Sequence, residues 1–338
     1  MINPASFLKG ALHPEGYHGK NKAAGFFEGW YVKLVSADLN QRWAVIPGIF
    51  KGISKADSNE READHEAFVQ VLDGSTGRSW FYPFPESEFE AAEDKFEVRV
   101  GKNFFSEHEI KLDLPQLSGS LQITTPFRPW PVTITSPGIM GWYGFVPFME
   151  CFHGIVSFGH ELTGNLSVEG KEKSFEKAKG YIETDWGKSF PAGYIWMQTN
   201  HFDFNNETSL IASAAIIPWL GRSFRGFIIG LHHEGKLYRW TTYNSSKEVK
   251  LALNDKEVMW EIVGPDGTIE IRAKRVRGGL LHAPLVKDMH RRVEETMDSS
   301  IRLTVRDSLN KVICEGTGQA AALEVFGDLD KLLAYGKN

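Results

Sequence analysis

Three residues able to take part in proton transfer alternate along one short segment: Tyr181, Glu183 and Asp185. In a strand, alternate residues point to the same face, so the two carboxyl groups lie side by side. Burying two carboxyl groups is costly unless they are paired or one keeps its proton, and such pairs are candidates for acid–base catalysis. Asp185 is therefore our first candidate for a general acid and Glu183 our second. The alternative is a solvated edge on which Lys188 neutralises them.

A third candidate acid, Glu28, alternates with Trp30 and Val32. The Glu28 carboxylate is buried if this apolar face points into the lumen of a barrel. The alternative is a glutamate at the rim that forms a salt bridge with a lysine or arginine.

The segment 136–154 is apolar but interrupted by proline and glycine, which excludes a regular strand or a long helix. So apolar a loop normally covers another part of the protein. We expect it to connect two halves of the chain and to pack across the mouth of a barrel. Its only carboxyl and imidazole groups, Glu150 and His153, are candidates for accepting a proton. Alternatively, the segment is an interdomain plug and His153 makes a structural hydrogen bond.

Strands are the elements predicted to position these groups, because 23 Phe, 10 Trp and 33 Gly among 338 residues favour β structure. Apolar runs bounded by turn residues occur at 30–35, 43–49, 67–72, 78–82, 96–100 and 120–124, and then at 194–200, 210–217, 226–231, 237–243, 258–263 and 268–273. One helix is expected near 285–298, since Leu285, Met289, Val293 and Met297 recur every four residues. A short second helix is expected at 328–333.

The two halves of the chain repeat the same order of features, at an offset of roughly 155 to 170 residues. Phe27–Trp30 corresponds to Ile182–Trp186, and the run that begins at Phe68 corresponds to the run that begins at Phe227. Chance similarity between two β meanders is the alternative. We predict an all-β fold of two tandem antiparallel barrels from an internal duplication, each of about eight strands and able to hold one small ligand. The expected division is residues 1–135, a connection at 136–155, and residues 156–338.

Several classes of protein are excluded by composition and motifs. The net charge of −5 and the scattered basic residues give no support for nucleic-acid binding. Two cysteines make neither a disulfide framework nor a cysteine zinc site, and we expect no metal. Phosphate-binding, dinucleotide-binding and nucleophile-elbow motifs are absent from the sequence. We expect a cytoplasmic protein without a signal peptide or spanning helix, and peripheral membrane contact stays open.

Five segments together resemble the tocopherol cyclase family: Phe27–Tyr31, Ser136–Gly141, Phe145–Gly154, Gly180–Pro191 and Gln198–Phe202. Ala321–Val325 is similar to the end of that family, and the match runs in order from about residue 14 to residue 327. The resemblance implies a lipocalin-related doubled barrel, akin to carotenoid hydratase-like proteins. It also implies an intramolecular lyase or isomerase of vitamin E biosynthesis, which closes the chromanol ring of a phytyl- or polyprenyl-benzoquinol without a redox cofactor.

Chromanol closure adds a phenol oxygen across an alkene, so a proton must reach an alkene carbon in a dry site. Asp185 is the expected acid, ahead of Glu183 and Glu28, and His153 or Glu150 is the expected acceptor of the phenol proton. The substrate-binding residues predicted around them are Trp30, Tyr31, Trp142, Tyr143, Trp186, Trp196, Gln198 and Asn200. A non-catalytic carrier of prenyl lipids and a terpenoid hydratase are the alternative functions.

Overall fold

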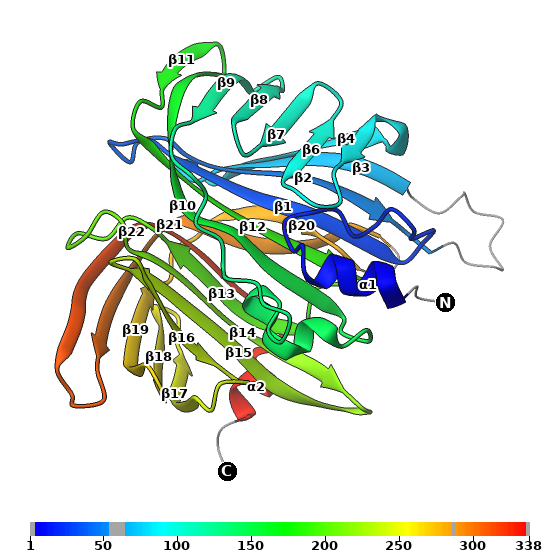
Figure 1. Ribbon diagram of the computed structural model, residues 1–338. Helices are drawn as coiled ribbons and strands as arrows, with labels where there is room; N and C mark the ends of the chain where they lie inside the picture. Colours follow the sequence, from blue (N-terminus) through cyan, green and yellow to red (C-terminus); the bar gives the residue numbers. More distant parts are fainter. Residues whose placement is uncertain (1–3, 54–64, 286–287, 336–338) are drawn as a thin grey trace. The chain divides into compact units, whose positions relative to one another are not determined.

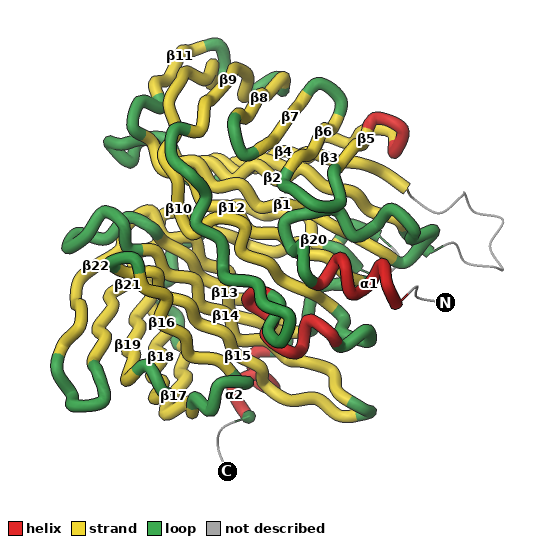
Figure 2. The backbone as a smooth tube through the Cα atoms, in the orientation of Figure 1, coloured by secondary structure: helices red, strands yellow, loops and turns green. Residues whose placement is uncertain are grey.

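The structure is a computed structural model that describes residues 4–53, 65–285 and 288–335. Strands make up most of it (Figure 2). The chain divides into two compact units. Unit 1 comprises residues 1–73, 79–190 and 281–292, and unit 2 comprises residues 74–78, 191–280 and 293–338. Among the described residues, none of the helices has the length and apolar character needed to cross a bilayer.

Unit 1 is built on one antiparallel sheet with the strand order β4-β3-β2-β1-β12-β10-β9-β8-β7-β6-β5, and β11 pairs with β10 (Figure 1). Its elements are α1 (Pro4–Ala11), β1 (Phe26–Val35), β2 (Arg42–Lys51), β3 (His65–Asp73), β4 (Arg78–Pro85), η1 (Glu86–Glu88), β5 (Phe89–Ala91), β6 (Glu97–Val100), β7 (Asn103–Ser106), β8 (Glu109–Asp113), β9 (Leu117–Ile123), η2 (Gly138–Phe145), β10 (Cys151–Val168), β11 (Lys171–Ser174) and β12 (Ala178–Gly187).

Unit 2 is built on a second antiparallel sheet with the order β16-β15-β14-β13-β22-β21-β19-β18-β17, and β20 pairs with β21. Its elements are β13 (Gly193–Thr199), β14 (Ser209–Trp219), β15 (Arg222–His233), β16 (Lys236–Thr241), β17 (Lys247–Leu253), β18 (Glu257–Gly264), β19 (Gly267–Lys274), β20 (Gly279–Ala283), β21 (Arg291–Arg306), β22 (Val312–Gly327) and α2 (Leu329–Ala334), of which β20 and β21 begin near the boundary between the units.

Each sheet curls around one apolar core. In unit 2, Phe227 on β15 packs edge-on against Trp260 on β18, with ring centroids 6.3 Å apart, although these strands lie near opposite ends of the sheet. In unit 1, Trp30 on β1 stacks on Phe89 of the terminal strand β5. Curling of this kind lets a sheet bury one face around its own core. The predicted all-β fold of two barrel-like halves is confirmed.

Both sheets follow one plan. In unit 1, the meander of β1 to β4 pairs through β1 with β12, and in unit 2 the meander of β13 to β16 pairs through β13 with β22. β3 and β15 therefore occupy equivalent places, as the repeat of Phe68 and Phe227 predicted. The other proposed correspondence is wrong. Phe27–Trp30 lies on β1 and Ile182–Trp186 on β12, and these two strands pair with each other in one sheet. The counterpart of β1 is β13.

Two features differ from the sequence predictions. The helix expected near 285–298 is wrong: β21 begins at Arg291, and residues 286–287 lie outside the described part of the chain. A spacing of four residues fits one face of a helix, but four is also even, so Val293 and Met297 share one face of a strand as well.

The short helix α2 is confirmed, with Asp328 accepting a hydrogen bond from the Lys331 amide as its cap. The boundary predicted at residue 156 falls inside β10, because β10 and β12 pair within the first sheet.

Candidate active site

The candidate site lies on three neighbouring strands in the middle of the unit 1 sheet. His153 on β10 is directly opposite Asp185 on β12, and Asp185 is directly opposite Gly29 on β1. Residues that face each other across antiparallel strands point to the same side of the sheet. We call this side, which carries Gly29, Glu183 and Asp185, the site face. The opposite side, which carries Trp30, Val32 and Ile182, is the core face.

A buried network of polar side chains connects β10 with β12. Nδ1 of His153 lies 2.8 Å from Oδ1 of Asp185, and Nε2 of His153 lies 3.6 Å from Oε2 of Glu183. The Tyr181 hydroxyl donates a hydrogen bond to Oε2 of Glu183. Tyr181 and Glu183 are buried, whereas the Asp185 side chain keeps 25% of its surface exposed. Asp185 is thus the carboxylate of this network that a bound molecule can reach most easily.

The imidazole of His153 is held in its charged form. Burial alone would lower its pKa, but the Asp185 and Glu183 carboxylates, together with the hydrogen bond to Asp185, raise the pKa of His153 to about 9. At neutral pH this histidine, whose side chain is 14% exposed, is therefore a cation with a carboxylate near each ring nitrogen. The pair His153–Asp185 stores one transferable proton on a 2.8 Å hydrogen bond.

Apolar side chains surround the polar row on the same face. Phe27, Phe50, Phe68 and Met289 form a buried cluster, and Phe190 packs edge-on against Phe27 at 5.3 Å between ring centroids. Cys151 joins this cluster, and burial, with the Asp185 and Glu150 carboxylates, raises the pKa of its thiol well above the usual value. The reactive groups therefore lie in surroundings that hold little water.

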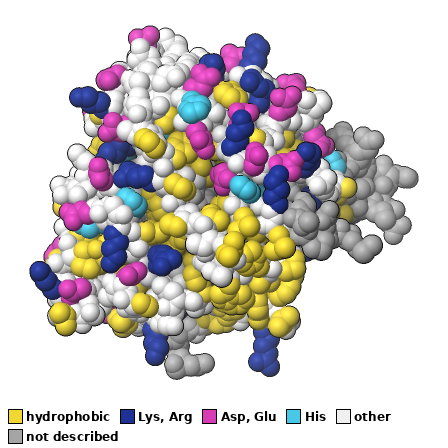
Figure 3. All heavy atoms as spheres, in the orientation of Figure 1, with side chains coloured by type: hydrophobic (Ala, Val, Ile, Leu, Met, Phe, Trp, Pro, Cys, Tyr) yellow, Lys and Arg dark blue, Asp and Glu magenta, His cyan; other side chains and the backbone are white. Residues whose placement is uncertain are grey.

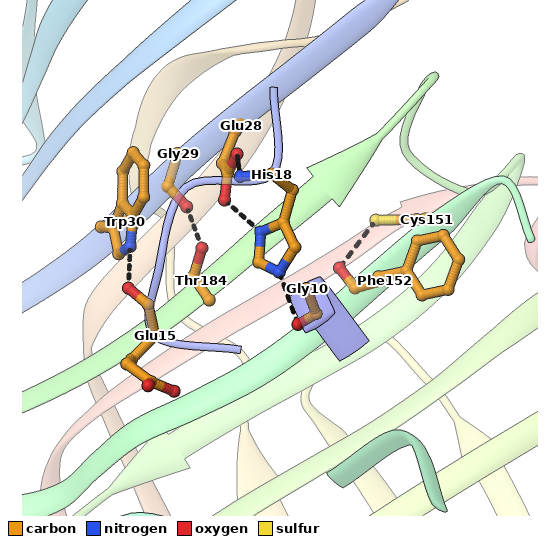
Figure 4. A network of polar contacts seen from close by, with 9 residues as sticks. All are labelled: Gly10, Glu15, His18, Glu28, Gly29, Trp30, Cys151, Phe152 and Thr184. Carbon is orange, nitrogen blue, oxygen red and sulfur yellow. Dashed lines mark hydrogen bonds and ion pairs between the residues drawn. The ribbon is translucent and has the colours of Figure 1, made fainter. Parts of the chain in front are cut away.

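Glu28 belongs to a different network, on the core face (Figure 4). It lies opposite Trp186 in the register between β1 and β12, and it has no exposed surface. Oε1 of Glu28 lies 2.6 Å from Nδ1 of His18, and Oε2 accepts a hydrogen bond from the His18 amide at 2.8 Å. The His18 ring stacks on Trp186 at 3.8 Å. Burial raises the pKa of Glu28, and His18 offsets part of this shift.

The predicted burial of Glu28 with Trp30 and Val32 is confirmed, but its partner is a histidine rather than a lysine or arginine. Glu28, the third candidate acid, lies on the opposite face of the sheet from Asp185 and Glu183. Side chains alternate along a strand, and Gly29, not Glu28, is the residue opposite Asp185.

The predicted substrate-binding residues are distributed over several places. Trp30 and Trp186 lie on the core face, whereas Tyr31 lies opposite Glu183 on the site face. Trp142 and Tyr143 stack on each other within η2, at 4.0 Å. A third group belongs to unit 2, on or directly after β13: Trp196, Gln198 and Asn200.

Glu150 lies just before β10, where its carboxylate accepts a hydrogen bond from the Ser189 hydroxyl at 2.8 Å and its carbonyl accepts one from the Lys188 amide. The loop just before β10 is thus fastened to the end of β12. The short helical turns of η2 agree with the expectation of no long helix in the segment 136–154. The expectation of no regular strand is wrong at the end of the segment, because residues 151–154 begin β10.

The same three residues could also hold a metal ion. His153, Glu183 and Asp185 each offer a ligand atom within 4.8 Å of the others, and they are the one such group in the described part of the chain. At neutral pH the raised pKa of His153 keeps both ring nitrogens protonated, so a metal ion could bind this imidazole only by displacing a proton.

Three residues of these networks were not among the predicted site residues. His18 reaches Glu28 through a loop, so no strand or helix spacing indicates their contact. The burial of Tyr181 was foreseeable from its alternation with Glu183, but its hydrogen bond to that carboxylate was not. Gly29 carries no side chain, and only the register with Asp185 reveals its position.

A family model described as tocopherol cyclase-like matches residues 120–327 of the chain. A protein named "Probable tocopherol cyclase, chloroplastic" from Oryza sativa subsp. japonica is 26% identical over 367 residues, which cover 92% of this chain and 77% of that protein. "Tocopherol cyclase, chloroplastic" from Zea mays is 23% identical over 368 residues, with the same coverage.

Two solved structures share the fold at 12% sequence identity. A protein assigned as AttH from Nitrosomonas europaea aligns with a TM-score of 0.51 over 88% of this chain and 92% of that one. The crystal structure of CghA with Sch210972 aligns with a TM-score of 0.53 over 89% of this chain and 88% of that one. At this identity the likeness concerns the fold alone.

Proposed function

Because this chain belongs to the tocopherol cyclase-like family, we propose that it closes the chromanol ring of a prenylated benzoquinol by adding the phenol across the nearest alkene of the prenyl chain. One carbon–oxygen bond and one carbon–hydrogen bond form, and the phenol O–H bond and the alkene π bond are lost. The product is an isomer of the substrate, so the reaction balances without an oxidant or reductant.

In the proposed reaction, His153 and Asp185 donate the proton and take it back. Asp185 takes the proton from Nδ1 of His153 and delivers it to an alkene carbon, which leaves a tertiary cation-like centre. The phenol oxygen attacks this centre, and the phenol proton returns to the pair. The cycle therefore ends in the protonation state in which it began.

A buried carboxylic acid protonates an alkene poorly, so positioning and a dry site must supply much of the barrier reduction. The phenylalanines of the site face support the cation-like centre through their ring faces, at about 1–2 kcal/mol each when water is excluded. Phe68 is a candidate because its ring lies 3.9 Å from the place of a Cβ atom on Gly29, and Phe27 is a candidate because it lies two residues before Gly29 on the same face.

One observation carries the proposal: the 2.8 Å contact between His153 and Asp185 lies on a partly exposed row of an otherwise buried, aromatic sheet face. The test is to incubate the purified protein with reduced phytyl- and polyprenyl-benzoquinols and to determine product masses. A product of unchanged mass with a chromanol spectrum is expected. A product heavier by one water identifies a hydratase, and tight binding without conversion identifies a carrier; either result rejects the proposal.

The proposed substrate is strongly apolar, and we propose that the protein collects it from a lipid surface through the segment around η2. Trp142 and Phe148 are 45% and 49% exposed, and Ile134 is 83% exposed. Hydrophobic side chains gather over η2 in Figure 3. No charged residue occurs between Arg128 and Glu150, and exposed aromatic side chains of this kind are favoured at the membrane interface.

A further inference from the structure

Gly29 has an unusual position for a glycine. It lies within β1, opposite Asp185 on one side and Gly48 on the other. Every other residue of β1 is buried, whereas Gly29 is partly exposed. Because β1 has a hydrogen-bonded strand on each side, solvent can reach Gly29 only from a face of the sheet. The two residues that continue the row, Asp185 and His153, are also partly exposed.

The fold does not require a glycine at this place. The backbone of Gly29 is not in the left-handed region. A Cβ atom there would meet Cγ2 of Ile46 at 3.5 Å and Cζ of Phe68 at 3.9 Å, which are ordinary contacts.

Gly48, the neighbour in the same row, is different. A Cβ atom on Gly48 would lie only 2.5 Å from Cζ of Phe68 and 2.7 Å from the Glu28 carbonyl oxygen. Packing therefore explains Gly48 but leaves Gly29 unexplained. A glycine inside a strand often marks a place where a ligand approaches the backbone.

We propose that Gly29 forms the floor of the subsite for the aromatic ring of the quinol, and that its missing side chain determines how many ring methyl groups fit. This inference rests on the proposed function. The phenol oxygen must reach the carbon next to the one that Asp185 protonates, so the ring lies within one residue spacing of Asp185. Gly29 meets this requirement because it lies directly opposite Asp185, and the side chains nearest to it on this face are the apolar Ile46 and Phe68.

The test compares Gly29→Ala and Gly29→Val with the wild type on prenyl-benzoquinols whose rings carry no, one, two or three methyl groups. For Gly29→Ala, kcat/KM should fall at least tenfold on the trimethyl substrate and less than threefold on the unmethylated one. Gly29→Val should lose activity on both the trimethyl and the unmethylated substrate. Binding of the oxidised, unreactive quinones, followed by tryptophan fluorescence, should show the same order. Ser167→Thr on β10 is the control, since it also adds a methyl group to a partly exposed strand residue of unit 1, far along β10 from His153.

Each outcome decides one point. Equal losses on all ring types, or no loss at all, would overturn the assignment of Gly29. A melting temperature of Gly29→Ala well below that of the wild type would do the same, because the glycine would then be structural. If the wild type converts none of the quinols, the proposed function fails; the quinone-binding series still tests whether Gly29 limits the ring.

Discussion

Glu28 and Asp185 lie on paired strands, one register position apart, yet they point to opposite faces of the same sheet. Glu28 is buried on the core face, where it contacts His18, and Asp185 belongs to the partly exposed row of the site face. The two carboxylates therefore have separable roles. Removing one should affect mainly stability, and removing the other mainly turnover.

Asp185→Asn should reduce turnover of a prenyl-benzoquinol by about 10²- to 10⁴-fold, because an amide can neither receive the His153 proton nor deliver it. Binding of the oxidised quinone should change little, since the side chain keeps its size. The measurement is steady-state turnover alongside fluorescence binding. Asp255→Asn, in an exposed turn of unit 2, is the control. Turnover by Asp185→Asn at the wild-type rate would remove Asp185 from the mechanism.

His18→Ala should lower the free energy of unfolding by about 3 kcal/mol, because it leaves the Glu28 carboxylate buried without its main partner. The matched control is His13→Ala. His13 also pairs with a glutamate, Glu15, but 40% of its side chain is exposed, and this change should cost less than about 0.5 kcal/mol. Denaturant unfolding of both variants makes the comparison. Equal losses for the two variants would show that the Glu28–His18 pair stabilises the fold no more than the exposed His13–Glu15 pair does.

Much of the fold follows from local patterns, because strands of alternating apolar residues and their turns are encoded in neighbouring residues. The placement of Tyr181, Glu183 and Asp185 on one face of a strand was predictable for the same reason. Pairing between distant strands was not: only the register reveals that β1 meets β12 and that Gly29 faces Asp185. The erroneous helix at 285–298 has the same origin, since a spacing of four residues fits both a helix and a strand.

Stability should depend on the protonation of His153. Its pKa is raised from 6.5 to about 9 in the folded protein. The protonated form is therefore favoured by folding, and the resulting stabilisation is complete below about pH 6.5 and is lost as the pH rises through about 9. The free energy of unfolding of the wild type, relative to His153→Gln, should decline by at most about 3 kcal/mol between these values.

Unfolding curves at several pH values test this, and nuclear magnetic resonance of the imidazole protons reports the pKa of His153 directly. A titration midpoint near 6.5 would contradict the predicted charged pair. Turnover should fall over the same range near pH 9, since His153 then loses the acidic proton that Asp185 would deliver.

Trp142→Ser combined with Phe148→Ser should weaken binding to lipid vesicles at least tenfold without lowering the melting temperature, because both side chains are substantially exposed. The matched control is Leu309→Ser, which removes a side chain that is 86% exposed in unit 2. Binding to neutral phosphatidylcholine vesicles should be insensitive to salt, since the segment between Arg128 and Glu150 carries no charge. Turnover of vesicle-held substrate should fall with binding, while turnover of detergent-dispersed substrate should not. A dependence on anionic lipid, or equal losses for the control, would contradict docking through η2.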